Sequence, residues 1–331
     1  MEYLQIFSYI SLLLLYFNVC RAEDFKVNVT IGYNVATTII VDQSGKGNFN
    51  TIQSAIDSIP SQNSQWTRIQ ISPGIYIEKV TIPIDKPYIY LEGADRKLTS
   101  IEWNDHADTA DSVTFTSFSD NIVAKGITFK NTYNHPVSPD VVGVVQAVAA
   151  RILGDKTAFY KCAFLGVQDT LWDDQGRHYF HKCYIEGAID FIFGNGQSIY
   201  EKCVINYSIG EYGPESYGYI TAHGRDSDDD PSGYVFKNCK FTGNGKAYLG
   251  RSWRPFARVI IADSVLLEVV EPQGWADMTY VEYNCMGPGA DTSKRVPWEK
   301  KLSEVELSQF TKISFIDNEG WIANLPVLVM Y

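Results

Sequence analysis

The sequence predicts an all-β fold, a parallel β-helix or solenoid, with short capping helices at its ends. Two observations carry this prediction: an internal repeat with a period near 20 residues, and the strand-like composition of each copy. The copies read aromatic, two residues of any kind, Cys, any residue, apolar; they are Phe159–Phe164, Phe180–Ile185, Tyr200–Ile205 and Phe236–Phe241. Such a period is too short for a pair of helices and fits a coil of three short strands with turns.

The cysteines of the repeat, Cys162, Cys183, Cys203 and Cys239, lie 21, 20 and 36 residues apart. Equivalent residues of stacked coils lie about 4.8 Å apart, so these side chains should form an inward ladder. That spacing allows disulfides, but buried free cysteine is equally ordinary, and we expect a mostly unpaired ladder. The longer last gap predicts an inserted loop of about 15 residues within 206–233, of the kind that lines binding faces of solenoids.

Helix signals stand near both ends of the chain. Thr51–Ile59 reads as a short amphipathic helix ended by Pro60, and Ser303–Glu306 has the form of a capping box. Because a solenoid needs covers over its end coils, we expect these helices to cap it. No linker divides the chain, so residues 23–331 are expected to form a single domain.

Residues 1–22 are predicted to be a signal peptide. The apolar run Ile6–Val19 is too short to span a bilayer but fits the core of a secretory signal, with Cys20 and Ala22 favouring cleavage after Ala22. Glu2 departs from the pattern, because no Lys or Arg precedes the run. The sequons Asn28–Thr30 and Asn206–Ser208 predict a secreted glycoprotein, with no membrane-spanning segment.

The net charge is −11, and removal of residues 1–22 leaves it unchanged. This balance argues against nucleic acid as a partner. It also means that a polyanionic substrate would need locally positive or neutral surface at the site. Aromatic residues make up 14% of the chain, which suits stacking on sugar rings or, equally, packing.

Two acidic residues occupy equivalent places in consecutive copies of the repeat. Asp169 lies seven residues after Cys162, and Asp190 lies seven residues after Cys183. Two carboxylates on neighbouring coils do not both ionise easily, so the pKa of one should rise while the other stays low. This asymmetry provides one acid and one nucleophile. The alternative is a pair of surface aspartates beside amide ladders.

Further polar residues fit the same site. Gln146 lies 22 residues before Gln168, again about one coil, and glutamine amides can donate to a developing oxyanion. Arg251 can pair with one aspartate and keep it ionised, and Trp253 can stack on a sugar. The alternative for these two residues is packing with a surface ion pair.

Taken in order, these motifs resemble those of plant pectin methylesterases (pectinesterases), over roughly residues 37–322. The matching stretches are Gly74–Glu78, Gln146–Ala149, Gln168–Leu171, Asp190–Asn195 and Leu249–Trp253. The resemblance implies a right-handed parallel β-helix, in a form without an inhibitor-like pro-domain. It implies an enzyme of the cell wall or apoplast that demethylesterifies homogalacturonan and releases methanol. It also implies a monomer without metal or organic cofactor, with a proteinaceous pectinesterase inhibitor as a candidate partner.

The resemblance also assigns roles to residues. Asp190 would be the nucleophile and Asp169 the acid/base, Gln168 and Gln146 would bind the oxyanion, and Arg251 would position Asp190. The residues implied in substrate binding are Gln146, Arg251, Trp253, Thr114 and Phe191, of which Thr114 has surroundings less like the family's. Ser252 stands where the family usually has proline, between Arg251 and Trp253.

Two other functions remain open on the sequence. Paired carboxylates also suit an enzyme that cleaves the polysaccharide backbone on the same fold, although the glutamine pair and Arg251 have no clear role there. The second alternative is a wall-binding protein or an inactive homologue of the enzyme. Methanol release indicates the esterase, new reducing ends indicate backbone cleavage, and pectin binding without either product indicates the non-catalytic homologue.

Overall fold

The structure is a computed structural model that describes residues 35–133, 135, 144–208, 218–276 and 280–327. The predicted signal peptide and the Asn28 sequon lie outside the described residues. Residues 209–217, part of the predicted inserted loop, also lie outside them.

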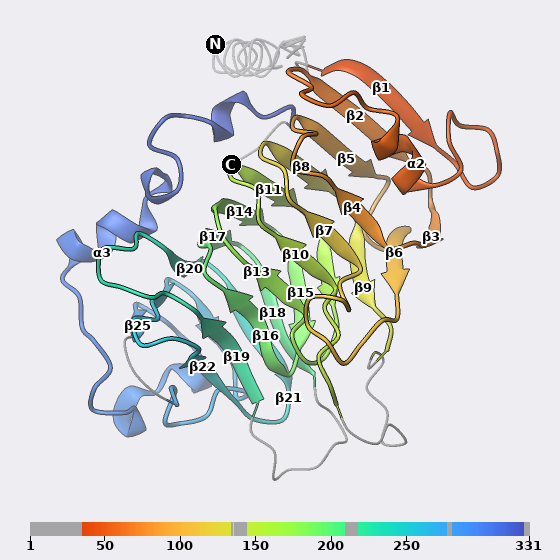
Figure 1. Ribbon diagram of the computed structural model, residues 1–331. Coiled ribbons are helices and arrows are strands. Elements are labelled where there is room, and N and C mark those ends of the chain that lie inside the picture. Colours follow the sequence, from red (N-terminus) through yellow and green to blue (C-terminus); the bar gives the residue numbers. More distant parts are fainter. Residues whose placement is uncertain (1–34, 134, 136–143, 209–217, 277–279, 328–331) are drawn as a thin grey trace, which may run out of the picture. The chain divides into compact units, whose positions relative to one another are not determined.

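The described chain winds into a parallel β-helix with three sheets (Figure 1). The 10-stranded sheet contains, in spatial order, β1 (Val35–Val41), β2 (Trp66–Ile71), β5 (Ile89–Gly93), β8 (Ile122–Lys125), β11 (Thr157–Tyr160), β14 (Arg177–His181), β17 (Gln197–Glu201), β20 (Gly233–Lys237), β23 (Val259–Ala262) and β25 (Tyr280–Tyr283). The 8-stranded sheet contains β3 (Gly74–Ile77), β6 (Thr99–Trp103), β9 (Thr128–Asn131), β12 (Ala163–Leu165), β15 (Tyr184–Gly187), β18 (Val204–Ser208), β21 (Lys240–Asn244) and β24 (Val265–Leu266). The 7-stranded sheet contains β4 (Val80–Ile82), β7 (Phe115–Ser117), β10 (Ala150–Ile152), β13 (Leu171–Asp173), β16 (Ile189–Gly194), β19 (Gly218–His223) and β22 (Ala247–Ser252).

The sequence repeat corresponds to one coil. Each central coil contributes one strand to every sheet, and the aromatic residue that opens each copy pairs in register with its equivalent on the next coil. Inside the helix these rings stack: Phe159 on Phe180 at 5.1 Å, Phe180 on Tyr200 at 4.5 Å, and Tyr200 on Phe236 at 4.6 Å between centroids. The repeat therefore sets the register of the coils through a column of buried rings.

The predicted cysteine ladder is present and unpaired. Cys162, Cys183, Cys203 and Cys239 are buried, Cys285 is half-buried, and all five are free thiols. Their Sγ atoms lie near main-chain carbonyl groups, as Cys183 does at 3.4 Å from the Phe159 oxygen. They act as small core residues with weak donors.

The insertion predicted between Cys203 and Cys239 does not add a coil. Among the described residues, β18, β19 and β20 are the strands between the two cysteines, and β17 pairs directly with β20 and β18 with β21. Residues 224–232 form a connection between β19 and β20, whereas residues 209–217, after β18, are outside the described part of the chain. Both segments lie within the predicted interval 206–233.

The two predicted helices form, but only one caps an end. Helix α2 (Ile52–Asp57) begins after Thr51, whose hydroxyl accepts a hydrogen bond from the Ser54 N–H, and buries its apolar face over the first coils. Helix α3 (Glu304–Thr311) has the predicted capping box between Ser303 and Glu306. It does not cover the last coil but lies beside β20 (Figure 1). Leu307 belongs there to an apolar cluster with residues of the 10-stranded sheet such as Val235 and Ile260.

Short 3₁₀ turns complete the C-terminal region. They are η1 (Pro288–Ala290), η2 (Thr292–Lys294), η3 (Ile313–Phe315) and η4 (Ile322–Asn324). Trp321 and Ile322 pack in the same outer cluster as Leu307. The segment after β25 is thus an arm against the 10-stranded sheet.

Candidate active site

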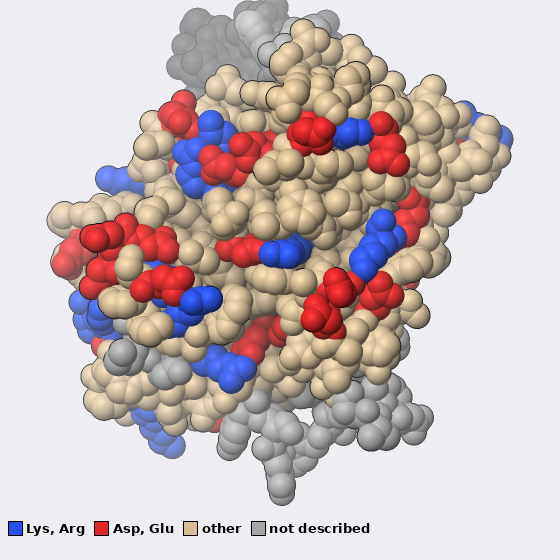
Figure 2. Space-filling view, in the orientation of Figure 1, with Lys and Arg blue, Asp and Glu red and all other residues tan. Residues whose placement is uncertain are grey.

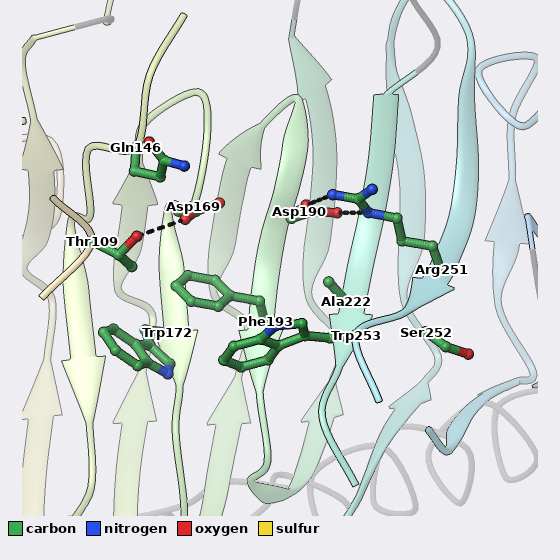
Figure 3. Close-up of a pocket in the computed structure, with 10 residues that line it drawn as sticks. All are labelled: Thr109, Gln146, Asp169, Trp172, Asp190, Phe193, Ala222, Arg251, Ser252 and Trp253. Carbon is green, nitrogen blue, oxygen red and sulfur yellow. Dashed lines mark hydrogen bonds and ion pairs between the residues drawn. The ribbon is translucent and has the colours of Figure 1, made fainter. Parts of the chain in front are cut away.

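A cavity of about 420 Å³ opens on the outer face of the 7-stranded sheet, near its middle (Figure 3). Its walls come from β13, β16, β19 and β22 and from the loops before β7 and β10. The lining residues are Thr109, Gln146, Asp169, Trp172, Asp190, Phe193, Ala222, Arg251, Ser252 and Trp253.

The two aspartates lie side by side on neighbouring coils, as the spacing predicts. Gln168, just before Asp169, forms a parallel bridge with Ile189, just before Asp190, and the Asp169 N–H donates to the Ile189 carbonyl at 3.0 Å. Both aspartates have left-handed backbone conformations, with φ of 61° at Asp169 and 48° at Asp190. Asp tolerates this region better than most residues with a Cβ.

Arg251 holds the carboxylate of Asp190. Its Nε donates to Oδ1 at 2.8 Å and its Nη2 donates to Oδ2, a bidentate contact. Arg251 belongs to β22, two coils beyond β16, so its side chain crosses β19 and lies over the ring of Tyr219 at 4.6 Å. The pairing of Arg251 with one aspartate that the sequence predicts is present.

Asp169 is buried and, among the described residues, has no arginine partner comparable to that of Asp190. The residue is only 9% exposed, and its carboxylate accepts a long hydrogen bond, 3.4 Å, from the Thr109 hydroxyl. Burial, and secondarily the charge of Asp190, raise the pKa of Asp169 from 3.8 to about 7. The raised pKa expected for one of the two aspartates is therefore found at Asp169, although desolvation contributes more than the neighbouring charge.

The glutamines flank the aspartates on adjacent coils. Gln146 and Gln168 form a parallel bridge with each other. Gln146 lines the cavity, with its amide beside Asp169 in Figure 3. Gln168 is half-buried and does not line the cavity, so the two predicted oxyanion ligands are not equivalent in this arrangement.

Aromatic side chains form one wall of the cavity. Trp172 and Phe193 stack with centroids 5.2 Å apart, and Trp253 meets Phe193 edge-on at 6.0 Å. Trp253 is 49% exposed. This wall presents flat apolar surface on which a sugar ring can stack.

Two predicted substrate contacts do not reach the cavity. Thr114 is fully buried, and its hydroxyl donates to the Lys130 carbonyl at 3.2 Å. Phe191 is also fully buried, in the interior of the β-helix. A Cβ on Gly187 would lie 2.2 Å from the Phe191 Cβ, so Phe191 packs closely against Gly187 in the core.

Sequence reasoning singled out neither Thr109 nor Trp172, and both line the cavity. Trp172 follows Asp169 by three residues, and the alternation of β13 points it outward, which was the available signal. Thr109 lies in the loop between β6 and β7, which has no equivalent in the sequence repeat. The described residues contain no group of three or more His, Cys, Asp or Glu side chains placed to hold a metal ion.

With the fold and this site established, comparison with known proteins gives the family. The Pectinesterase family model matches residues 38–319. "Probable pectinesterase 55" of Arabidopsis thaliana is 51% identical over 302 residues, which cover 88% of this chain and 92% of that protein. "Pectinesterase QRT1" of Arabidopsis thaliana is 40% identical over 310 residues, which cover 87% of this chain and 80% of that protein. The chain belongs to the pectinesterase family and is a carboxylic ester hydrolase of that class.

Solved structures agree. The pectin methylesterase from carrot superposes with a TM-score of 0.81 at 30% identity, covering 88% of this chain and 96% of that one. The deglycosylated pectin methylesterase from Aspergillus niger superposes with a TM-score of 0.74 at 29% sequence identity, and the match again covers 88% of this chain and 96% of that one. This match confirms the predicted right-handed parallel β-helix. Within the described residues, no helix has the length and apolar character needed to cross a bilayer.

Proposed function

We propose that this chain demethylesterifies homogalacturonan through a covalent intermediate on Asp190, with Asp169 as the general acid and base. One observation carries the proposal: an arginine-paired carboxylate and a carboxyl group with a pKa of about 7 lie on neighbouring coils in one open cavity. Pectin methyl ester is the substrate that the family membership supports.

In the first half-reaction, a carboxylate oxygen of Asp190 attacks the carbonyl carbon of the ester. The charge that develops on the carbonyl oxygen is stabilised by the Gln146 amide, with Gln168 as the second candidate donor. The bond to the methoxy oxygen then breaks, and Asp169 gives its proton to that oxygen, so that methanol leaves. The product on the enzyme is an anhydride between Asp190 and the galacturonate.

In the second half-reaction, Asp169 is a carboxylate and takes a proton from water as the water attacks the anhydride. Collapse releases the galacturonic acid and returns Asp190 as the carboxylate paired with Arg251. Asp169 regains its proton, so both groups end as they began. No step uses a cofactor. Trp253, Trp172 and Phe193 provide the stacking surface that holds the sugar.

The setting of this activity is also a proposal. We infer secretion to the cell wall and apoplast from residues 1–22, and glycosylation from the two sequons. The amide of Asn206 donates to the Glu186 carboxylate at 2.8 Å, so a glycan there would replace that contact. A proteinaceous inhibitor and a monomeric state remain predictions.

The test is methanol release from highly methylated pectin by wild type, Asp190→Asn and Asp169→Asn, with reducing ends counted in the same samples. We expect methanol without new reducing ends from wild type, and severe loss in both variants. Reducing ends in place of methanol would indicate backbone cleavage. Pectin binding without either product would indicate an inactive, wall-binding homologue.

A further inference from the structure

A row of lysines runs along the corner between the 10-stranded and the 8-stranded sheets. Lys161, Lys182 and Lys202 occupy the same corner position on three consecutive coils, with φ of 53°, 56° and 56°. The main-chain N–H of each donates to the carbonyl of the next coil, at 2.9, 2.9 and 3.0 Å. The residues on both sides pair in register, so the three side chains are stacked about 4.8 Å apart. We call them the lysine ladder.

The fold itself does not favour lysine at these positions. A left-handed conformation is disfavoured for residues with a Cβ, and Asn and Asp tolerate it best. On the later coils the same corner carries Asn238, Asp263 and Asn284, also with positive φ. Like charges stacked on adjacent strands repel each other. Lysines at this position on three consecutive coils are thus unfavourable both for the left-handed backbone and because their charges repel each other.

The ladder is exposed to solvent and free of ion pairs among the described residues, and Arg96 adds a fourth positive charge beside it. All three lysines are exposed, and no carboxylate among the described residues forms an ion pair with them. Arg96 lies across two of the coils, since its Nη1 donates to the carbonyls of Lys182 at 3.0 Å and Cys162 at 3.4 Å.

Buried His181 is adjacent to the ladder, and its pKa is affected by the positive charge of the three lysines. Burial lowers the pKa of His181, the Glu201 carboxylate opposes the shift, and the charges of Lys182, Lys202 and Lys161 add to the lowering. The Nε2 atom of His181 is buried without a hydrogen-bond partner among the described residues. All three lysines are therefore close enough for their charges to act together on the same side chain.

The cations near the cavity differ, because each has a carboxylate partner. Arg251 pairs with Asp190, Arg151 with Asp174, and Arg254 with Asp226. Figure 2 shows the face that carries the 7-stranded sheet, where most Lys and Arg side chains lie beside Asp or Glu. These three arginines near the cavity are therefore ion-paired, whereas no ion pair is found for the lysines of the ladder among the described residues.

We propose that the lysine ladder is a non-catalytic binding site for an acidic polysaccharide with consecutive free carboxylates. The choice of polymer rests on the proposed function, because demethylated stretches of homogalacturonan are its product. A row of evenly spaced point charges matches a linear polymer with evenly spaced anions, and exposed ammonium groups bind such a polymer reversibly and in a salt-dependent way. In a chain with a net charge of −11, this row can hold a polyanion that the rest of the surface repels.

The ladder and the cavity can be occupied together. The cavity lies on the 7-stranded sheet, whereas the ladder lies at the corner of the other two sheets. A polymer region already demethylated, bound at the ladder, keeps the enzyme near methylated regions and raises their effective concentration at the cavity. This would increase retention on pectin without changing the chemistry at Asp190.

The test is a triple variant, Lys161→Asn, Lys182→Asn and Lys202→Asn, because Asn suits the left-handed backbone. The matched control is Lys46→Asn, Lys294→Asn and Lys312→Asn, three exposed lysines elsewhere with the same total charge change. Co-sedimentation with polygalacturonate at low salt should show binding at least about tenfold weaker in the ladder variant, with a smaller salt dependence. The unfolding temperature should not fall.

Equal binding by the ladder variant and the control would overturn the proposal. So would ladder-dependent binding that is stronger to duplex DNA or to phosphatidylserine vesicles than to polygalacturonate. Methanol release from short methylated oligomers, measured in parallel, should be unchanged in the ladder variant, and its loss would contradict a non-catalytic role. If wild type releases no methanol, the proposed function fails, while ladder-dependent binding is still decided by the sedimentation result.

Discussion

Asp169 should destabilise the protein at neutral and alkaline pH, and Asp169→Asn should relieve this. The pKa of the carboxyl is raised from 3.8 to about 7 in the folded state. The native state therefore binds the proton more tightly than the unfolded state. Stability falls as pH rises from about 4 to about 7 and stays reduced above that.

The raised pKa gives the magnitude. At about 1.4 kcal/mol per pKa unit, the ionisable carboxyl reduces the free energy of unfolding by about 2 kcal/mol at pH 5 and about 4 kcal/mol at pH 8. Asn is nearly isosteric with the neutral acid, tolerates the left-handed backbone, and can still accept from Thr109. The gain from Asp169→Asn should therefore be about 2 kcal/mol larger at pH 8 than at pH 5.

The measurement is chemical unfolding of wild type and Asp169→Asn at both pH values, with Asp229→Asn as the control. Asp229 is exposed, so its substitution should change stability little at either pH. The same purified Asp169→Asn sample should release almost no methanol, giving a variant that is more stable and inactive. A gain of equal size at pH 5 and pH 8 would refute the raised pKa, and with it the assignment of Asp169 as the proton donor.

Three further predictions follow from the same geometry. Gln146→Ala should lower kcat by about 10²–10³ with little change in KM; an effect confined to KM would show that the amide binds substrate without stabilising the oxyanion. Methanol release by wild type should decrease as pH rises above about 7, because Asp169 then loses the proton that it donates; a rate that keeps rising to pH 9 would contradict this. Gly187→Ala should lower both the unfolding temperature and the activity, because the new Cβ would lie 2.2 Å from the Phe191 Cβ; wild-type values for both would show that the backbone beside Asp190 can move freely.

The repeat predicts the fold because each coil contributes the same chemical pattern. The aromatic residue and cysteine of each copy occupy fixed inward positions, so a spacing of about 20 residues translates directly into one coil. For the same reason the spacing alone predicts that Asp169 lies beside Asp190. The prediction that α3 caps the last coil was wrong because the capping box defines where a helix begins but not which surface it covers.

One part of the site that sequence reasoning missed lies outside the repeat. Thr109 comes from the loop between β6 and β7, whose path no periodicity describes. Thr114 and Phe191 were expected at the substrate from motif position alone. Thr114 is fully buried with its hydroxyl on the Lys130 carbonyl, and Phe191 points into the core. Asp190 lines the cavity whereas Phe191, the next residue, lies in the core, so nearness to Asp190 in the chain does not place a side chain at the substrate.

The backbone of the two aspartates also decides which substitutions are informative. Asp169 and Asp190 both have positive φ, a conformation that alanine adopts only at a cost of about 1–2 kcal/mol. Replacing either by Ala would therefore combine loss of the carboxyl with backbone strain, and at Asp190 would also remove the bidentate contact with the Arg251 guanidinium. Asn keeps the conformation and one acceptor oxygen for Arg251. A loss of methanol release in Asp190→Asn, with the unfolding temperature near that of wild type, can accordingly be attributed to the missing nucleophile, whereas the same loss in an Ala variant could not.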